Sequence, residues 1–262
     1  MEKRVTNNKM KKVSVILTTF NCQENIEKTL KSIEEQDYPD VEIVVKDGGS
    51  TDGTLDIIKK YKNQSTIPVI VTSCSDKGIY DAMNQGYALT TGEILVFFND
   101  RFIEASVISK MVEAMDRLNP KTGKPYAGAH ADLVYADGDG VIRSWHMGEG
   151  NIKQGWMPGH PTLFLRREIY EKYGLYNTSF RIAADYEFMI RFLKDEENQL
   201  VYLPETIVSM YYGGTSSSGL SSYLLSLKEG HRALKINGIK GAWVVDVLRT
   251  MRVLLQFVKA KC

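Results

Sequence analysis

Residues 13–17 read VSVIL, and three further short runs rich in β-branched residues follow them along the chain. These runs are DVEIVVK (40–46), PVIVT (68–72) and ILVFF (94–98). Between them lie segments with apolar residues at helical spacing, such as Ile26, Leu30 and Ile33. Buried strands that alternate with helices are typical of a parallel sheet flanked by helices. The sequence therefore predicts an α/β fold for this part of the chain.

Polar segments that are rich in glycine and carboxylates follow the four predicted strands. They are TTFN (18–21), DGGSTDGT (47–54), SCSDKGIYD (73–81) and NDRF (99–102). In a parallel α/β sheet the ligand binds beyond the carboxyl ends of the strands, so these segments are predicted to line the site. They contain neither the dinucleotide fingerprint G-x-G-x-x-G nor the phosphate loop G-x-x-x-x-G-K-[ST]. Carboxylate oxygens instead suit Mg²⁺ or Mn²⁺ that carries a nucleoside diphosphate.

The composition is that of a folded protein. Of the 262 residues, 43% are hydrophobic and 25% are charged, which is ordinary for a globular domain. Lys and Arg total 33 against 32 Asp and Glu, and this balance argues against a protein whose main task is to bind nucleic acid. The three cysteines are scattered and form no C-x-x-C pair. They favour reduced thiols in the cytoplasm over a disulfide framework or a structural zinc site.

No segment of the sequence predicts insertion into a membrane. The first twelve residues are polar and basic and lack the apolar core of a signal peptide. The longest apolar run, Ile94–Phe98, is far shorter than the roughly 20 residues that span a bilayer. We therefore expect a cytoplasmic protein, with any membrane contact being peripheral at the inner face of the cytoplasmic membrane.

The last twenty residues form a separate amphipathic segment. From Trp243 onward, apolar residues recur at helical spacing and most charged residues fall elsewhere. A basic amphipathic helix can lie in a membrane interface. The same helix can instead pack on the core or on the second subunit of a homodimer. The sequence leaves these interpretations of residues 243–262 open.

Segments spread over roughly residues 11–212 resemble the family-2 glycosyltransferases with the GT-A fold. They are VSVILTTFN, EIVVKDGGSTDGT, SDKGIYDAMNQG, TGEILVFFND, GHPTLFLRREIYEKYGLYNTSF and RIAADYEFMIRFL. The resemblance implies a Rossmann-like, mostly parallel central sheet flanked by helices, with a C-terminal helical segment. It also implies four parts. They are a flexible tail (1–10), a nucleotide-sugar-binding half (11–102), an acceptor-binding half (103–212), and a loop with amphipathic helices (213–262).

The resemblance assigns the donor pocket to residues at the strand ends. Asp47 matches a carboxylate that accepts a hydrogen bond from the uracil of a UDP-sugar, and an ionised carboxylate selects a base edge that presents a donor. Thr18 matches another position of the nucleotide pocket. Asp76 and Lys77 lie on the same rim, where a lysine suits a phosphate or a neighbouring carboxylate. For Asp47 the other interpretation is a turn and a cap of the next helix, for Thr18 a strand-end hydroxyl bonded to the backbone, and for Asp76 and Lys77 a solvated loop.

Asn99 and Asp100 take the place of the family's D-x-D metal motif, with one acidic residue where two or three are usual. Asp100 is therefore the predicted ligand of Mn²⁺ or Mg²⁺. The metal would bridge the donor diphosphate and neutralise charge on the leaving UDP. The shortened motif leaves open whether a metal is required, because Arg101 offers positive charge at the same place.

On the acceptor side, Asp185 in RIAADYEF matches the catalytic base, the carboxylate that takes a proton from the attacking hydroxyl. The other interpretation of Asp185 is a helix cap, and Glu187 is the second candidate base. His160 lies where family members line the acceptor channel, and Trp156 offers a ring that can stack on a sugar. Both are equally interpretable as core residues.

These features predict an inverting glycosyltransferase that moves a sugar from a nucleotide donor, most simply a UDP-sugar, to a hydroxyl of a glycan acceptor. The segment DKGIYDAMN is most similar to enzymes that assemble bacterial surface polysaccharides, which implies a lipid-linked acceptor. Two alternatives stay open. A non-catalytic nucleotide-sugar-binding protein would need no base, and a nucleotidyltransferase of related fold would need a glycine-rich basic loop where this chain has TTFNCQEN.

Overall fold

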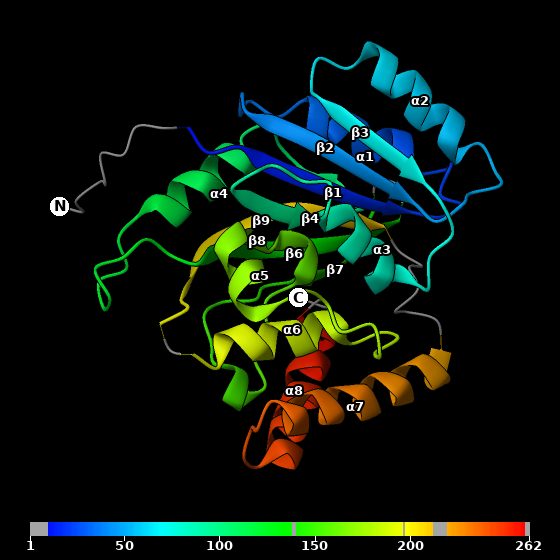
Figure 1. The fold of residues 1–262 in the computed structure, drawn as a ribbon. Helices are drawn as coiled ribbons and strands as arrows, with labels where there is room; N and C mark the ends of the chain where they lie inside the picture. Colours follow the sequence, from blue (N-terminus) through cyan, green and yellow to red (C-terminus); the bar gives the residue numbers. More distant parts are fainter. Residues whose placement is uncertain (1–9, 138–139, 196, 212–218, 260–262) are drawn as a thin grey trace.

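The computed structural model describes residues 10–137, 140–195, 197–211 and 219–259 (Figure 1). Nearly all of the predicted tail and most of the loop predicted to begin at residue 213 lie outside the described residues.

The first half of the chain alternates strands and helices as the sequence predicts. The elements are β1 (Val13–Thr19), α1 (Ile26–Glu34), β2 (Val41–Asp47), α2 (Thr54–Gln64), β3 (Val69–Ser73), α3 (Ile79–Tyr87) and β4 (Ile94–Phe97). β1 pairs in parallel with β2 on one side and with β4 on the other, and β3 pairs in parallel with β2. All four strands therefore end at the same edge of the sheet.

The second half extends the same sheet. Its elements are β5 (Arg101–Phe102), α4 (Val107–Asp116), β6 (Gly128–Asp137), β7 (Gly140–Trp145), η1 (Ile152–Gln154), η2 (His160–Thr162), β8 (Phe164–Arg166), α5 (Arg167–Tyr173), α6 (Ala184–Leu193), β9 (Leu200–Tyr211), α7 (Gly219–Ile236) and α8 (Ala242–Lys259). The strand order continues from β4 through β8, β6 and β9 to β5, and β7 pairs with β6. β8 is antiparallel to both of its neighbours, whereas β6 and β9 are parallel.

The predicted α/β class is confirmed, and the sheet is mixed where the antiparallel strands join it. One sheet runs through both halves of the chain. The predicted boundary at residue 102 therefore does not separate two sheets. The assignment of the donor to the first half and of the acceptor to the second stays a prediction.

The side chains of β1 alternate between two hydrophobic clusters, one on each face of the sheet. Val13, Val15 and Leu17 belong to the cluster that includes buried residues of α1, α2 and α4. Ile16 belongs to the cluster that includes α3, α5 and α6. Figure 1 shows these two groups of helices on opposite sides of the sheet. The core therefore lies in two layers, with the strand ends between them.

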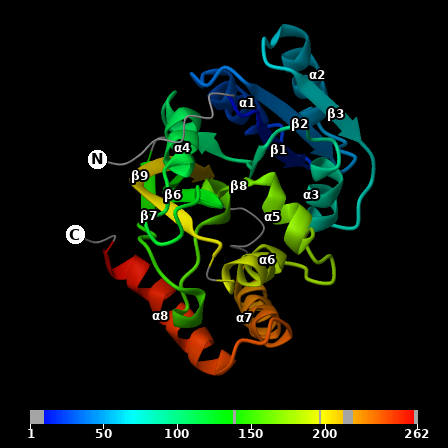
Figure 2. The same cartoon turned by 60° about the vertical axis from the view of Figure 1, so that its left-hand side comes forward.

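Helix α7 packs on α6, and α8 packs on α7, η1 and β7, away from β1–β3 (Figure 2). Glycines permit the close approach of α8. A Cβ atom at Gly155 would lie 2.4 Å from the backbone nitrogen of Arg249, and one at Gly230 would lie 2.3 Å from the Arg249 guanidinium. Gly155 also has a φ of +70°, which favours glycine. A larger residue at Gly155 would push the backbone of α8 away, whereas one at Gly230 would displace the Arg249 side chain.

One side of α8 is buried and another is exposed. Ala242 and Val245 are packed in the core, whereas Trp243, Val247 and Met251 are exposed by 70%, 52% and 54%. The packing interpretation of the C-terminal segment thus holds for the buried side, and an apolar face is left uncovered on the opposite side. Among the described residues, every helix is too short or too polar to cross a membrane.

Candidate functional site

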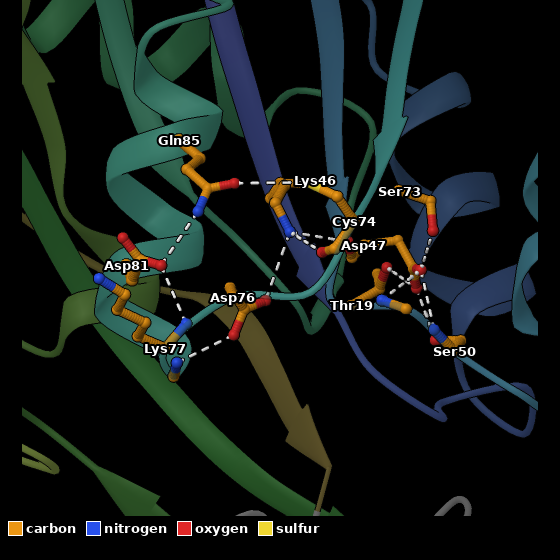
Figure 3. Close-up of polar contacts among 12 residues, drawn as sticks. Thr19, Lys46, Asp47, Ser50, Ser73, Cys74, Asp76, Lys77, Asp81 and Gln85 are labelled. Carbon is orange, nitrogen blue, oxygen red and sulfur yellow. Dashed lines mark hydrogen bonds and ion pairs between the residues drawn. The ribbon is translucent and has the colours of Figure 1, made fainter.

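The loop after β2 is organised around the carboxylate of Asp47, which is fully buried. Oδ1 accepts hydrogen bonds from the hydroxyls of Ser50 (2.5 Å) and Thr19 (3.1 Å). Oδ2 accepts from the hydroxyl of Ser73 (2.7 Å) and from the amides of Gly49 and Ser50 (2.9 Å each), as Figure 3 shows in part. Burial alone raises the pKa of Asp47, but these donors outweigh it and hold the pKa below its ordinary value. The carboxylate therefore ties together the ends of three strands.

The predicted contact between Asp47 and the uracil stays a prediction. The hydrogen bonds that the carboxylate already accepts compete with such a contact. An ionised carboxylate offers about four acceptor sites, and five protein donors already address this one. A base N–H would therefore have to displace one of them.

A buried cation, Lys46, lies beneath the loop after β3. Its ammonium donates to the carbonyl oxygens of Asp47 and Cys74 (2.7 Å each) and to Oδ2 of Asp76 (3.3 Å) (Figure 3). Its side chain is fully buried, and that of Asp76 is 15% exposed. The other oxygen of Asp76 accepts from the amide of Gly78 (2.9 Å). Lys46 is thus the charge that fixes Asp76. The only sign of this role in the sequence is a lysine near the end of a mostly apolar strand.

Lys77 lies next to this ion pair and is exposed. Its backbone amide donates to Oδ2 of Asp81 (2.9 Å), which also accepts from the side chain of Gln85 (3.0 Å). Lys77, Tyr80 and Arg181 line a cavity of about 590 Å³. The exposed Lys77 side chain thus borders a cavity, and its contact with a phosphate stays a prediction.

Thr18 and Asn99 form a reciprocal pair that joins the ends of β1 and β4. The amide of Thr18 donates to the Asn99 side-chain oxygen, and the Asn99 side-chain nitrogen donates to the Thr18 hydroxyl, both at 3.0 Å. With Asp76 and Gly48 they line a cavity of about 530 Å³, a volume within the range of roughly 300–1,000 Å³ that is usual for ligand pockets. Three of the predicted donor residues therefore meet in one cavity.

Asp100, the predicted metal ligand, is 8% exposed. Its Oδ1 accepts from the amide of Tyr211 at 3.3 Å. Burial raises the pKa of Asp100 to about 7, and the Tyr211 amide works in the opposite direction. Within the described ranges, no three His, Cys, Asp or Glu side chains converge as a metal cluster. Mg²⁺ is often bound through one or two carboxylates with substrate phosphates and water, so this chain's single carboxylate fits a metal shared with a diphosphate.

Asp185 lies half-buried in the first turn of α6. Its Oδ1 accepts a hydrogen bond from the Tyr80 hydroxyl (3.0 Å), and burial together with the Asp185 charge raises the pKa of Tyr80. His160 belongs to the same cluster, with Nε2 lying 2.8 Å from the Tyr176 hydroxyl. Burial lowers the pKa of His160, and the charge of Asp185 acts against it. Ala183 occupies the N-cap, so Asp185 is not the N-cap residue, but its place in the first turn of α6 is where a negative side chain favours the helix dipole.

Two other candidates on this side are engaged elsewhere. Glu187 is buried, forms an ion pair with Arg191 (2.7 Å) and accepts from the side chain of Asn237 (3.0 Å). Trp156 is 6% exposed and donates to the carbonyl oxygens of Met147 and Gly148 (3.1 Å each). Glu187 is therefore a structural residue, and the structure favours the core interpretation of Trp156 over an open stacking surface.

Glu229 of α7 holds the base loop, which we define as residues 181–183. Its carboxylate is buried and accepts hydrogen bonds from the backbone amides of Arg181, Ile182 and Ala183, at 2.9–3.1 Å. Successive amides that converge on one anion form a binding concavity. The residues involved are 46–48 positions apart in the sequence, so no local pattern predicts this contact. A C-terminal helix thus fixes the segment that leads into Asp185.

The fold and these strand-end side chains place a rim that carries carboxylates at the carboxyl edge of an α/β sheet. The family model described as glycosyl transferase family 2 matches residues 14–174. The chain belongs to glycosyltransferase family 2, so its class is that of the glycosyltransferases.

Named relatives support this membership. The PGL/p-HBAD biosynthesis glycosyltransferase of Mycobacterium tuberculosis is 31% identical over 217 residues, which cover 78% of this chain and 79% of that protein. A dolichyl N-acetyl-alpha-D-glucosaminyl phosphate 3-beta-D-2,3-diacetamido-2,3-dideoxy-beta-D-glucuronosyltransferase of Methanococcus voltae is 27% identical over 223 residues, covering 78% and 68%.

Solved structures share the fold. S. aureus TarS 1–349 in complex with UDP-GlcNAc has a TM-score of 0.68 and 20% identity, over 92% of this chain and 71% of that one. The mannosyltransferase PcManGT from Pyrobaculum calidifontis, in complex with GDP-Man and Mn²⁺, has a TM-score of 0.65 and 17% identity, over 96% and 76%. The chain spans 39% of a longer TarS structure. The predicted GT-A fold is confirmed.

Replacement of Lys46 by Met should lower the free energy of unfolding by about 3–5 kcal/mol, because it leaves the carboxylate of Asp76 without its buried partner. The double variant Lys46→Met/Asp76→Asn should lose less than the sum of the two single variants, with a coupling energy of about 0.5–3 kcal/mol. Urea unfolding measures all three. Lys77→Met, an exposed neighbour, is the control and should change stability by less than about 0.5 kcal/mol. Strictly additive losses would show that the two charges do not act as a unit.

Proposed function

We propose that the protein is an inverting glycosyltransferase of bacterial cell-surface polysaccharide biosynthesis. It transfers a sugar from a nucleoside-diphosphate donor, UDP-linked, to a hydroxyl of a lipid-linked glycan. The observation that carries the proposal is the Asp185 carboxylate, which is half-buried and oriented by Tyr80 at 3.0 Å. The complex of TarS with UDP-GlcNAc and the names of the two relatives support the donor and acceptor classes.

The proposed reaction is a direct displacement at the anomeric carbon. The acceptor oxygen attacks from the face opposite the diphosphate, the bond between the anomeric carbon and the phosphate oxygen breaks, and UDP leaves. The attacking hydroxyl gives its proton to Asp185. Because the Tyr80 hydroxyl donates to Oδ1, Oδ2 is the oxygen assigned to the acceptor. His160, in the same cluster, is assigned to the acceptor side of the site.

The donor is assigned to the cavity lined by Thr18, Asn99 and Asp76. Lys77 is assigned to a phosphate of the donor, and the uracil contact to Asp47. When bound, Mn²⁺ or Mg²⁺ supplies a Lewis acid for the leaving diphosphate, and Asp100 is the residue that would hold it.

Asp185→Asn keeps the size of the side chain and removes its basicity. Transfer should fall by about 10²–10⁴-fold, the usual contribution of a general base, while UDP affinity and the melting temperature stay nearly unchanged. Radiolabelled transfer assays, titration calorimetry with UDP and thermal unfolding measure the three quantities. Glu187→Gln is the control, and it should lower stability more than rate. A wild-type rate in Asp185→Asn would remove the base assignment, and tight donor binding without transfer to any lipid-linked glycan would favour a nucleotide-sugar-binding protein.

Mn²⁺ or Mg²⁺ should tighten UDP binding to the wild-type protein, and Asp100→Asn should abolish this enhancement because it removes the anionic ligand. Titration calorimetry with UDP, with and without metal, measures the effect, and Asp137→Asn at the end of β6 is the control. Turnover that is insensitive to EDTA would contradict the metal assignment and would leave Lys77 and Arg101 as the groups that neutralise the donor phosphates.

The exposed apolar face of α8 is proposed to contact the membrane peripherally. Replacing Trp243, Val247 and Met251 by Ser should reduce co-sedimentation with anionic liposomes, since burial of apolar area drives interfacial binding. UDP binding and stability should be retained, because these side chains are exposed. The control replaces Val141 and Ile142, which are exposed on β7. Unchanged liposome binding, together with a mass that depends on concentration only in the wild type, would assign the face to a homodimer.

A further inference from the structure

A cavity of about 320 Å³ lies between the end of β7 and the helices α7 and α8. Figure 2 shows these two helices below the sheet, with α8 running beside the loop that follows β7. Trp145, Met157, Tyr223 and Leu227 contribute its apolar lining. The cavity is separate from the one lined by Thr18 and Asp76, with which it shares no lining residue.

The charged side chains that line this cavity are the guanidinium groups of two arginines, and a histidine lies beside them. Arg249 and Arg252 come from α8, and His146 follows β7. Among the described residues that line it there is no Asp or Glu. An anion that enters meets Arg252, whereas the Arg249 guanidinium already donates to the carbonyl oxygen of Ser226 (3.4 Å) and lies 4.0 Å from the carboxylate of Asp246, which is outside the lining. A guanidinium group recognises phosphate oxygens, which it binds through its fork of N–H donors.

Hydrogen bonds to protein groups hold His146 and Arg252 in place. Nδ1 of His146 lies 2.8 Å from Oδ2 of Asp132, which is 4% exposed. The other oxygen of Asp132 accepts from the amide of Met147 and the hydroxyl of Tyr202, at 2.8 Å each. The imidazole is thus fixed by a fully engaged carboxylate. On the opposite wall, Nε of Arg252 donates to the carbonyl oxygen of Gln154 at 3.2 Å.

The cavity is connected both to the base and to an exposed apolar surface. The guanidinium carbon of Arg249 lies 4.5 Å from the ring centre of Tyr186, the residue that follows Asp185. Next to lining residues in the sequence, Leu224 on α7 and Met251 on α8 are exposed by 57% and 54%. An amphiphile whose anionic end lies at Arg252 could therefore leave its chain on this apolar face.

We propose that this cavity binds a lipid phosphate, that is, the phosphate or diphosphate of a long-chain alcohol together with its first few carbon atoms. The inference rests on the proposed function, because it takes the acceptor to be lipid-linked. Inorganic phosphate would leave the aromatic and apolar walls unused. A bilayer cannot enter a cavity of this volume. The combination of cations and apolar walls therefore fits a single amphiphilic molecule.

The test uses farnesyl phosphate below its micellar concentration, with farnesol and inorganic phosphate as matched probes. Trp145 and Trp156 line the cavity, so tryptophan fluorescence should change saturably with farnesyl phosphate and only weakly with the other two. Arg252→Gln should weaken binding by roughly tenfold to a hundredfold, the effect of losing one charge-assisted hydrogen bond. Tyr223→Ser should weaken it as well. Lys228→Gln removes an exposed cation of α7 outside the cavity and should have no effect.

UDP binding, measured on the same samples, separates this inference from the proposed function. If UDP binds and farnesyl phosphate does not, or if Arg252→Gln and Lys228→Gln behave alike, the cavity is not a lipid-phosphate site and the donor assignment stands. If UDP does not bind the wild type, the proposed function fails first. Binding to phosphatidylglycerol vesicles without binding to farnesyl phosphate would overturn the inference in favour of a membrane surface.

Discussion

The candidate site depends on the parallel pairing of β1 on both of its edges. The register places Thr19 opposite Asp47 and Ile16 opposite Phe97, so that three strands end within hydrogen-bonding distance of one another. The contacts of Thr19 with Asp47 and of Thr18 with Asn99 follow directly from it. A shift of one residue would turn every side chain of β1 to the opposite face. Side chains of β1 that now pack in one hydrophobic cluster would face the other cluster. The hydrogen bonds that join the strand ends would be lost as well.

The sequence predicts the first half of the fold closely because the signals there are local. The runs at 13–17, 40–46, 68–72 and 94–98 differ from β1, β2, β3 and β4 by one or two residues at their ends. The mixed half is different. β8 has three residues and owes its antiparallel place between β4 and β6 to partners far away in the sequence, which no periodicity encodes.

The same distinction separates the site residues that the sequence predicts from those it misses. Thr18, Asp76 and Asn99 meet in one cavity because strand topology alone brings them together. Lys46 owes its role to two carbonyl groups and a carboxylate that surround it only in the fold. For Trp156 the sequence leaves a stacking role and a core role open, because an aromatic residue in a loop gives no sign of whether its ring faces solvent or the core. The roles of Asp47, Asp100 and Asp185 in binding and chemistry stay predictions.

The contact between Glu229 and the base loop has a consequence for synthesis on the ribosome. The strand ends that form the donor rim are all translated by residue 102, and their pairing needs only residues that have already emerged. The amides of residues 181–183 are translated well before the carboxylate that binds them. A nascent chain can therefore assemble the rim first, and the segment that leads into Asp185 reaches its final geometry only when α7 docks. During cotranslational folding the strand-end rim would thus form before the segment 181–183 reaches its final geometry, although one sheet joins the two halves of the chain in the folded protein.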